Sequence, residues 1–261
     1  MKKTIITLFC LAGVASAATT GTIDTTDSTL ASYLDFTTSP SEATYGAVAE
    51  VKDGYGVIKD GCTMWSRNSV FGTVSTSAFT LSFDVRSFDK GDLVSVGAGT
   101  TDSNWDKVTL NTGDDGALAL KFYHNTEGTT YSISTGLTSG TRTEWTTLTL
   151  VGDTMKLDGS DTVSKVVSLY VDGVYQDSLD MSTLSTAGWC NQNFDGFQFG
   201  NGFRGTGTCN KIAGSAEIDN VLFYKRALTA TEVKALVVPE PTTATLSLLA
   251  LAGLAARRRR R

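Results

Sequence analysis

Residues 214–236, GSAEIDNVLFYKRALTATEVKAL, hold the strongest fold signals in this chain. The first half is a near-continuous run of β-forming apolar residues, which predicts a strand buried on at least one face. In the second half, Thr229 stands three residues before Glu232, the spacing of a helix capping box. Apolar residues then follow at helical spacing, at Val233, Leu236 and Val237. We therefore predict a strand, a turn and a short helix.

Two motifs in this stretch resemble the last core strand and the following turn of LamG-like jelly-roll domains. They are Ile218-Asp219-Asn220-Val221 and the run YKRALT at residues 224–229. LamG-like domains belong to the concanavalin A-like lectin/glucanase superfamily. The resemblance implies an all-β fold, a two-sheet antiparallel jelly-roll sandwich, over roughly residues 33–236. The family often has His after the Trp that corresponds to Trp145, whereas this chain continues with Thr146.

A period of two marks the clearest further strand, at residues 79–86. Phe79, Leu81, Phe83 and Val85 alternate with Thr80, Ser82, Asp84 and Arg86. This alternation predicts a strand with one buried face and one polar face. Other expected strands lie at residues 33–36, 93–96, 105–110, 118–123 and 145–151, with residues 57–58 and 62–65 forming a second hairpin region.

Residues 166–179 predict a hairpin whose turn is specified by sequence. Asp172-Gly173 is a preferred type I′ pair because both turn residues need positive φ. A two-residue loop would place Val171 opposite Val174 and Tyr170 opposite Tyr175. The run LYVDG at residues 169–173 also resembles a LamG-like hairpin.

The two ends read as sorting segments around one domain at residues 18–238. Residues 1–17 combine Lys2 and Lys3, a short apolar core and the small-residue site Ala15-Ser16-Ala17, which predicts a secretory signal peptide. Residues 239–261 combine Pro239-Glu240-Pro241, an apolar run and five arginines. Fifteen helical residues reach roughly 22 Å, short of the ~30 Å hydrocarbon core, so a span would be marginal.

This C-terminal order resembles the PEP-CTERM sorting signal. The resemblance implies retention in the inner membrane through a short apolar helix, with the arginines on the cytoplasmic side. It also implies cleavage near Pro239-Glu240-Pro241 by an exosortase-type processing enzyme, followed by display on the cell surface or release. An ordinary membrane anchor is the alternative.

The net charge of the predicted domain limits the classes of molecule that it can bind. The chain has 22 Lys and Arg against 27 Asp and Glu, and the terminal segments hold seven of the basic and one of the acidic residues. The domain at residues 18–238 therefore has 15 basic and 26 acidic residues, a net charge of −11. Such a surface repels nucleic acid, so we predict no nucleic-acid partner.

Three cysteines survive removal of the predicted signal peptide. Cys190 and Cys209 lie 19 residues apart in a Gly- and Asn-rich region, which favours a disulfide in an oxidising compartment. Cys62 could be buried, or could pair with either of the others.

Catalytic residues are considered because the superfamily contains glycoside hydrolases. Their retaining mechanism needs two carboxylates about 5 Å apart. Glu217 and Asp219 match the first two positions of the Glu-x-Asp-x-x-Glu pattern, but the third falls on Leu222. The alternative, which we favour, places Glu217 at the start of the strand and Asp219 in a hydrogen bond to the following turn. His124 is the sole histidine and is expected at a strand end as a surface residue.

A calcium site would use Asp102, Asn104 and Asp106, since these oxygen ligands suit Ca²⁺ and some LamG-like domains use calcium. Asp and Asn are also common in turns for backbone reasons. We predict no required cofactor, with calcium as the alternative.

A carbohydrate site needs an aromatic platform ringed by polar groups. Trp189, Asn191, Asn193 and Arg204 cluster in one Gly-rich loop region. The alternative is a structural loop whose Phe194, Phe197 and Phe199 fill the core.

We therefore predict a secreted or surface-displayed binding or adhesion module that is not an enzyme, with glycans as its partners by analogy with the superfamily. The rival is a structural envelope or extracellular-matrix protein without a small ligand, and a glycoside hydrolase comes third.

Overall fold

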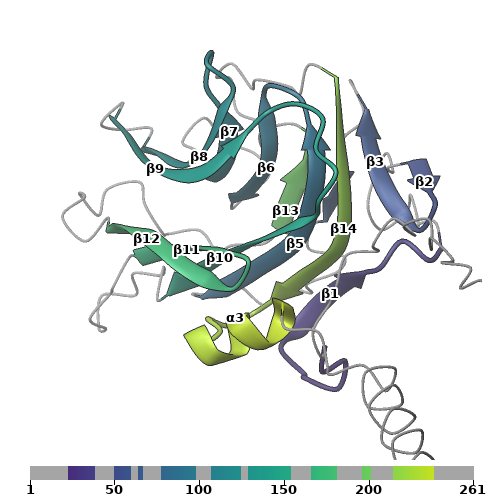
Figure 1. Ribbon diagram of the computed structural model, residues 1–261. Coiled ribbons are helices and arrows are strands. Elements are labelled where there is room, and N and C mark those ends of the chain that lie inside the picture. Colours follow the sequence, from purple (N-terminus) through teal and green to yellow (C-terminus); the bar gives the residue numbers. More distant parts are fainter. Residues whose placement is uncertain are drawn as a thin grey trace, which may run out of the picture.

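Two antiparallel β-sheets packed face to face form the domain (Figure 1). The computed structural model describes residues 23–38, 50–59, 64–66, 78–97, 107–124, 129–153, 166–180, 196–200 and 214–237. The elements are β1 (Leu30–Leu34), β2 (Glu50–Lys52), β3 (Tyr55–Lys59), β4 (Met64–Ser66), β5 (Phe79–Phe88), β6 (Asp92–Gly97), β7 (Lys107–Thr112), β8 (Ala117–His124), β9 (Thr129–Thr138), β10 (Thr146–Asp153), β11 (Val166–Val171), β12 (Val174–Asp180), β13 (Gly196–Phe199), β14 (Ser215–Tyr224) and α3 (Ala230–Val237).

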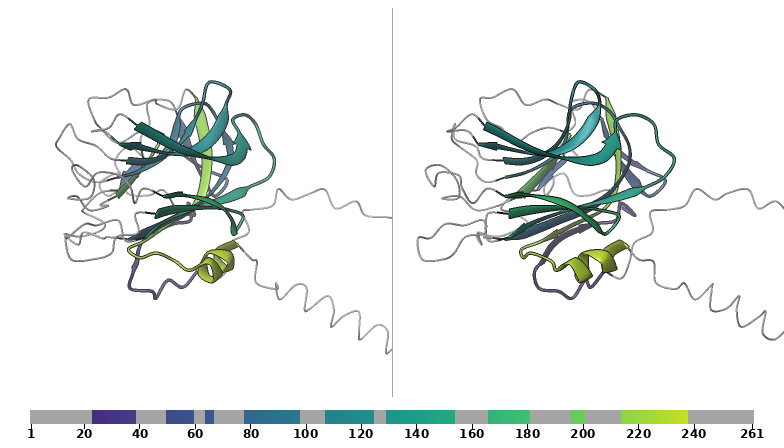
Figure 2. Two further views of the ribbon diagram at one scale, coloured as in Figure 1. Left: turned by 90° about the vertical axis from the view of Figure 1, so that its left-hand side faces the viewer. Right: turned by 60° about the vertical axis from the view of Figure 1, so that its left-hand side comes forward.

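The larger sheet has the order β12-β11-β10-β5-β14-β3-β2, with β1 also paired to β14, and the smaller has the order β4-β13-β6-β7-β8-β9. Figure 2 shows the two layers, with α3 on the outer face of the larger sheet. This arrangement confirms an all-β sandwich of two antiparallel sheets. Within the described residues, no helix is long and apolar enough to cross a membrane.

Alternate residues of both sheets meet in one apolar core between the layers. Phe83 on β5 and Phe199 on β13 pack edge to face, with ring centroids 5.0 Å apart, and so join the two sheets. Phe197 also lies fully buried in this core. The core-filling role predicted for Phe197 and Phe199 is confirmed, whereas Phe194 lies outside the described residues.

The predicted strand, turn and helix of residues 214–236 are confirmed as β14 and α3. β14 pairs with β5 along one side and with β3 and then β1 along the other, so it lies inside the sheet. Its outward-facing Leu222 and Tyr224 pack with Val233 and Leu236 of α3 in a second apolar cluster. The helix is therefore held by apolar contact with the outer face of the sheet.

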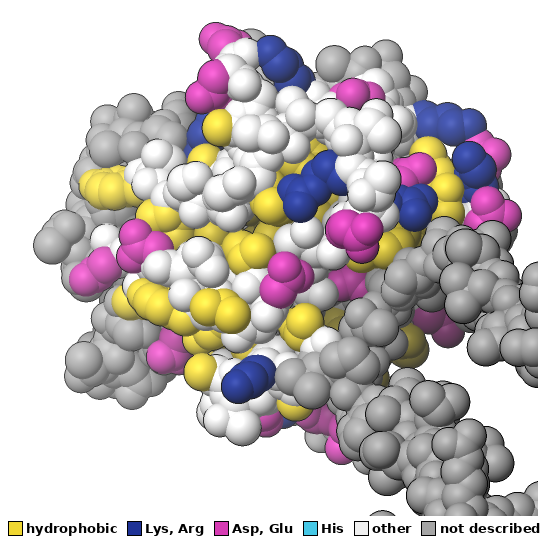
Figure 3. Space-filling model, viewed as in Figure 1, with side chains coloured by type: hydrophobic (Ala, Val, Ile, Leu, Met, Phe, Trp, Pro, Cys, Tyr) yellow, Lys and Arg dark blue, Asp and Glu magenta, His cyan; other side chains and the backbone are white. Residues whose placement is uncertain are grey.

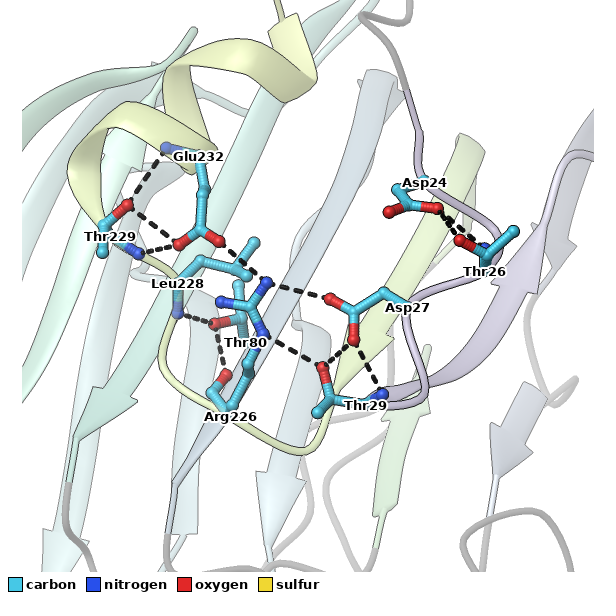
Figure 4. Close-up of polar contacts among 9 residues, drawn as sticks. All are labelled: Asp24, Thr26, Asp27, Thr29, Thr80, Arg226, Leu228, Thr229 and Glu232. Atoms are coloured by element: carbon cyan, nitrogen blue, oxygen red, sulfur yellow. Dashed lines mark hydrogen bonds and ion pairs between the residues drawn. The ribbon is translucent and has the colours of Figure 1, made fainter.

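A clasp around Arg226 fixes the turn between β14 and α3 (Figure 4). The Arg226 guanidinium contacts Asp27 at 2.9 Å and Glu232 at 2.8 Å, and its Nε donates to Thr29. The predicted capping box is present, since Thr229 N donates to Glu232 Oε2 at 2.7 Å and Glu232 N donates to Thr229 Oγ1 at 3.3 Å. One side chain thus ties the segment before β1 to the start of α3.

The predicted hairpin of β11 and β12 is also confirmed. Asp172 and Gly173 have φ values of 50° and 71°, as a type I′ turn requires. Val171 pairs with Val174, and Tyr170 pairs with Tyr175.

One prediction for β5 was wrong, because both of its faces are buried. Thr80, Ser82 and Asp84 are nearly inaccessible although they point away from the core. Thr80 Oγ1 donates to the Arg226 carbonyl and accepts from Leu228 N, so the turn before α3 covers this end of the strand. Ser82 Oγ shares a hydrogen bond with Thr149 Oγ1 on β10. The polar face is buried because each polar group finds a partner there.

The predicted second hairpin region was wrong as well. β3 pairs with β2 and β14 in the larger sheet, whereas β4 pairs with β13 in the smaller one. The first strand also ends earlier than predicted, at Leu34, and Phe36 follows it with a φ of 50°. The Phe36 ring is buried against Gly56, where a Cβ would overlap it.

Candidate functional site

Most residues predicted to form a site lie outside the described part of the chain. They are the carbohydrate candidates Trp189, Asn191, Asn193 and Arg204, the cysteines Cys190, Cys209 and Cys62, the calcium candidates Asp102, Asn104 and Asp106, and the sorting motif Pro239, Glu240 and Pro241. His124 is the last residue of β8, so its predicted place at a strand end is confirmed.

Glu217, the first of the two glycosidase candidates, is engaged in a structural cluster on the outer face of the larger sheet. Arg86 Nε contacts Glu217 Oε2 at 2.7 Å. The Arg86 guanidinium lies 4.9 Å and 4.6 Å from the ring centroids of Tyr55 and Trp145, which themselves pack edge to face 5.6 Å apart. These cation–π contacts and the ion pair hold the carboxylate in place.

Asp219, the second candidate, is 8% exposed. Its Oδ1 accepts from Asn220 N, so it hydrogen-bonds the next residue of the strand rather than the turn that we predicted. Burial raises the pKa of its carboxyl to about 7. The neighbouring Asp84, 3% exposed, accepts from Thr147 and Asn220 and is sealed from solvent. The third position of the catalytic pattern, Leu222, packs beneath α3. Within the described residues, these groups form no accessible carboxylate pair.

A row of polar side chains crosses the outer face of the smaller sheet. Its residues pair in register from β13 to β9, and they are Gln198, Ser95, Thr109, Lys121 and Ser132. Each has apolar neighbours along its own strand that point into the core, such as Phe197 and Phe199 beside Gln198. Because side chains alternate along a strand, the row points away from the core. We call these five residues the polar row.

Hydrogen bonds orient most of the polar row. Ser95 Oγ and Thr109 Oγ1 share a hydrogen bond, and Thr109 is also within 3.1 Å of the Val94 carbonyl. Asn111 Nδ2 donates to Asp92, which leaves the Asn111 carbonyl to accept from Lys121 Nζ at 2.7 Å. These contacts hold the hydroxyl, amide and ammonium groups in defined directions.

Among the described residues, Gln198 and the exposed Ser132 are the two members of the polar row without a side-chain hydrogen bond, and Gln198 is the buried one. Its side chain is 6% exposed, yet no hydrogen bond to its amide is found among the residues that the structure describes. An amide carries one acceptor and two N–H donors, and buried polar groups almost always have a partner. Leaving such a group unpaired costs about 1–3 kcal/mol. The Gln198 amide is therefore the point in the row with unused capacity to bind another molecule.

Exposure increases along the polar row. Ser95 and Thr109 are buried on β6 and β7, Lys121 is half-buried on β8, and Ser132 is exposed on β9. The row thus offers hydroxyl, amide and ammonium groups, which can hydrogen-bond a polyhydroxylated ligand. Alternation of apolar and polar residues marks the polar position within each strand. The sequence does not show that these positions form one row, because that depends on which strands pair.

The described residues form no candidate metal centre, and the face of the molecule drawn in Figure 3 has no patch of a single charge sign. They contain no group of three or more His, Cys, Asp or Glu that could hold a metal ion. On the face seen in Figure 3, basic and acidic side chains are interspersed rather than gathered by sign. This face therefore lacks the basic stripe that nucleic-acid binding requires.

Solved structures similar to this one include binding domains of two toxins. The binding domain of botulinum neurotoxin serotype G is 13% identical, with a TM-score of 0.52, over 80% of this chain and 50% of that one. The binding domain of Paraclostridial Mosquitocidal Protein 1 is 17% identical, with a TM-score of 0.52, over 80% and 52%. This chain spans about half the length of those structures, and at such identity the likeness shows the fold.

No curated protein matches the sequence significantly. A family model, Laminin_G_3, does match residues 60–234. Because this match covers more than half of the chain and agrees with the observed sandwich, the protein belongs to the concanavalin A-like lectin/glucanase superfamily.

Proposed function

We propose that this protein is a non-catalytic glycan-binding module, and that the polar row on the smaller sheet contributes to its site. The observation that carries the proposal is the amide of Gln198, which has no hydrogen-bond partner among the described residues and stands at the buried end of a row whose other end, at Lys121 and Ser132, is open to solvent. Sugar hydroxyls both donate and accept hydrogen bonds, so they suit an amide that needs both kinds of partner. Lys121 and Ser132 extend the same row toward solvent.

One further observation supports binding rather than catalysis. The Glu217 carboxylate is paired with Arg86, and Asp84 and Asp219 are buried. A hydrolase would need carboxylates that reach the substrate.

We also propose that the protein is exported through residues 1–17 and held in the inner membrane through residues 239–261. An exosortase-type enzyme would then cut near Pro239-Glu240-Pro241 and release the domain to the cell surface or the medium. The support is the order of the terminal motifs and the acidic domain between them. A pulse-chase experiment tests this proposal, since Pro239→Ala and Pro241→Ala should each slow the appearance of the shorter product.

A glycan array probed with the full chain, with and without calcium, tests the binding proposal. Gln198→Met removes the amide but keeps the side-chain length, and we expect at least a tenfold loss of affinity. Replacing an unpaired buried amide by an apolar group should leave stability unchanged or raised. The matched control is Gln176→Met on the exposed part of β12 in the other sheet, which should bind as the wild type does.

Three results would contradict this site or this function. Equal affinity in the Gln198 and Gln176 variants would remove the polar row from the site. Loss of binding in Trp189→Ala alone would place the site in the loop at residues 189–204. A folded chain that binds no glycan in either condition would favour the structural envelope role.

A further inference from the structure

The strands of the smaller sheet differ in charge from those of the larger sheet. The domain at residues 18–238 has a net charge of −11, and strands β2, β5, β10, β12 and β14 of the larger sheet all contain acidic residues. Within the strands of the smaller sheet, which is the layer away from α3 in Figure 2, Asp92 is the sole acidic residue, whereas Lys107 and Lys121 are basic. The smaller sheet therefore repels an anion less than the larger sheet does.

The acidic residue of this sheet is withdrawn from the surface. Asp92 is 3% exposed, and its Oδ1 accepts from Asn111 Nδ2. The Asn111 carbonyl accepts from Lys121 Nζ at 2.7 Å, so the Asn111 amide connects the ammonium to the carboxylate. A carboxylate buried to this extent cannot contact a ligand, but it polarises the amide that holds Lys121. The ammonium is thus held in a fixed direction, with a neutral group as its partner.

Lys121 has unused capacity to bind an anion. An ammonium carries three N–H donors, and the hydrogen bond to Asn111 uses one of them. No carboxylate of the described residues lies within ion-pair distance of Lys121, which is half-buried and so interacts with an opposite charge more strongly than a fully hydrated lysine would. Its register partner on β9, Ser132, is exposed and adds a hydroxyl. These donors suit the oxygens of a carboxylate or a sulfate.

We propose that the polar row selects glycans that carry a negatively charged group, and that this group binds Lys121. The inference rests on the glycan binding proposed above and names the class of glycan. Neutral sugar hydroxyls would bind toward the other end of the row, where the Gln198 amide has no partner within the described chain. Neighbouring strands lie about 4.8 Å apart, so Gln198 and Lys121, three strands apart, are separated by about 14 Å. A ligand that contacts both is therefore an acidic oligosaccharide rather than a single sugar.

A glycan array of matched pairs, probed with the full chain, tests the proposal. Each oligosaccharide that contains a uronic or sialic acid stands beside its methyl ester, which keeps the sugar and removes the charge. We expect the wild type to bind the free acids at least about fivefold more tightly than the esters, because a charge-assisted hydrogen bond forms. Sulfated oligosaccharides beside their desulfated forms make up a second set. A preference that depends on Lys121 supports the proposal in either set, and the set that shows it identifies the anion as carboxylate or sulfate.

Three variants separate the Lys121 charge from other effects. Lys121→Gln keeps a donor for the Asn111 carbonyl but removes the charge, so it should fold normally and bind acids no better than esters. Lys121→Arg keeps the charge and should keep the preference. The matched control is Lys52→Gln on β2, which removes an exposed charge from the larger sheet and should bind as the wild type does. In about 1 M salt, where the Debye length is about 3 Å, the preference of the wild type should shrink.

The possible failures of this inference and of the proposed function are distinguishable. Equal binding of acids and esters by the wild type would overturn the inference and leave glycan binding standing, which Gln198→Met tests by itself. A preference that survives in Lys121→Gln, or that Lys52→Gln loses to the same extent, would also overturn the inference, because the charge at position 121 would then not be its cause. A folded chain that binds neither acids nor neutral glycans would overturn both proposals.

Discussion

Asp84 on β5 and Asp219 on β14 are paired in register across adjacent strands, and both carboxyl groups are buried. The pair lies where the register shifts, next to Asn220 at a φ of 48°. The Asn220 side-chain amide donates to Asp84 Oδ2 at 2.8 Å, while its backbone N–H donates to Asp219 Oδ1 at 2.8 Å. One residue in the left-handed region thus bridges two acids, and the pKa of each acid is raised by burial.

The Asp219 carboxyl should make the protein less stable as pH rises. Its pKa is about 7 in the folded state, against the ordinary aspartate value of 3.8 that applies in the unfolded chain. Between these values the folded state binds more protons than the unfolded state, so stability falls from about pH 4 to pH 7 and then levels. We expect Asp219→Asn to raise the free energy of unfolding at pH 8 by on the order of 2 kcal/mol.

Urea unfolding of the wild type and Asp219→Asn at pH 4, 6 and 8 measures this effect. The difference between the two proteins should grow with pH. A difference that stays constant would mean that the folded and unfolded pKa values of Asp219 are the same.

The clasp around Arg226 should give the opposite pH dependence. Hydrogen bonds from Thr29 and Arg226 lower the pKa of Asp27 to about 2, and bonds from Arg226 and Thr229 lower the pKa of Glu232 to about 2. Their stabilisation is complete above about pH 4.5 and is lost as pH falls toward 2. We expect Arg226→Gln to cost about 1 kcal/mol at pH 7, because the clasp is partly exposed.

Thermal unfolding followed by circular dichroism at pH 7 and pH 2.5 tests the clasp. The melting temperatures of the wild type and Arg226→Gln should differ at pH 7 and converge at pH 2.5. Lys225→Gln, a substitution of the same charge one residue earlier, is the control for net charge. An equal loss at both pH values would mean that Arg226 stabilises the turn by packing alone.

Gly152 and Phe79 are register partners, and the Phe79 ring occupies the space that a side chain at position 152 would need. We expect Gly152→Ala to destabilise the protein by about 1–3 kcal/mol through overpacking. Phe79→Leu should also destabilise it, because the ring is fully buried and stacks near Phe223. The double variant should lose less than the sum of the two, as chemical denaturation would show. If the two losses of stability simply add in the double variant, the cost of Gly152→Ala does not come from contact with the Phe79 ring.

The turn between β11 and β12 should tolerate Asn at position 172 but not Ala at position 173. Gly173→Ala places a side chain at positive φ and against α3, so we expect a loss of about 1–2 kcal/mol. Asp172→Asn keeps an oxygen acceptor for Thr147 N and a residue that accepts positive φ, so its stability should stay within about 0.5 kcal/mol of the wild type. Equal losses in the two variants, measured by urea unfolding, would contradict this account.

Local sequence predicted those elements whose signals lie within a few residues. Asp172-Gly173 predicted the hairpin register, and Thr229 with Glu232 predicted the start of α3. The site could not be predicted in the same way. In the sequence, Gln198 stands only between Phe197 and Phe199, which were expected to fill the core. Its neighbours in the polar row are brought to it by pairing among β13, β6 and β7.

The sequence by itself determined the positions of several strands, the turn of the hairpin, the capped helix and the family, since these depend on period, turn chemistry and short motifs. Only the tertiary structure decided what is buried outside the core. Thr80 is polar and looked exposed, but the Arg226 turn, 146 residues away, covers it and satisfies its hydroxyl. Gln198 is also polar and buried, yet the described chain supplies its amide with no partner. Burial depends on which distant segments meet, and this information is absent from any local pattern.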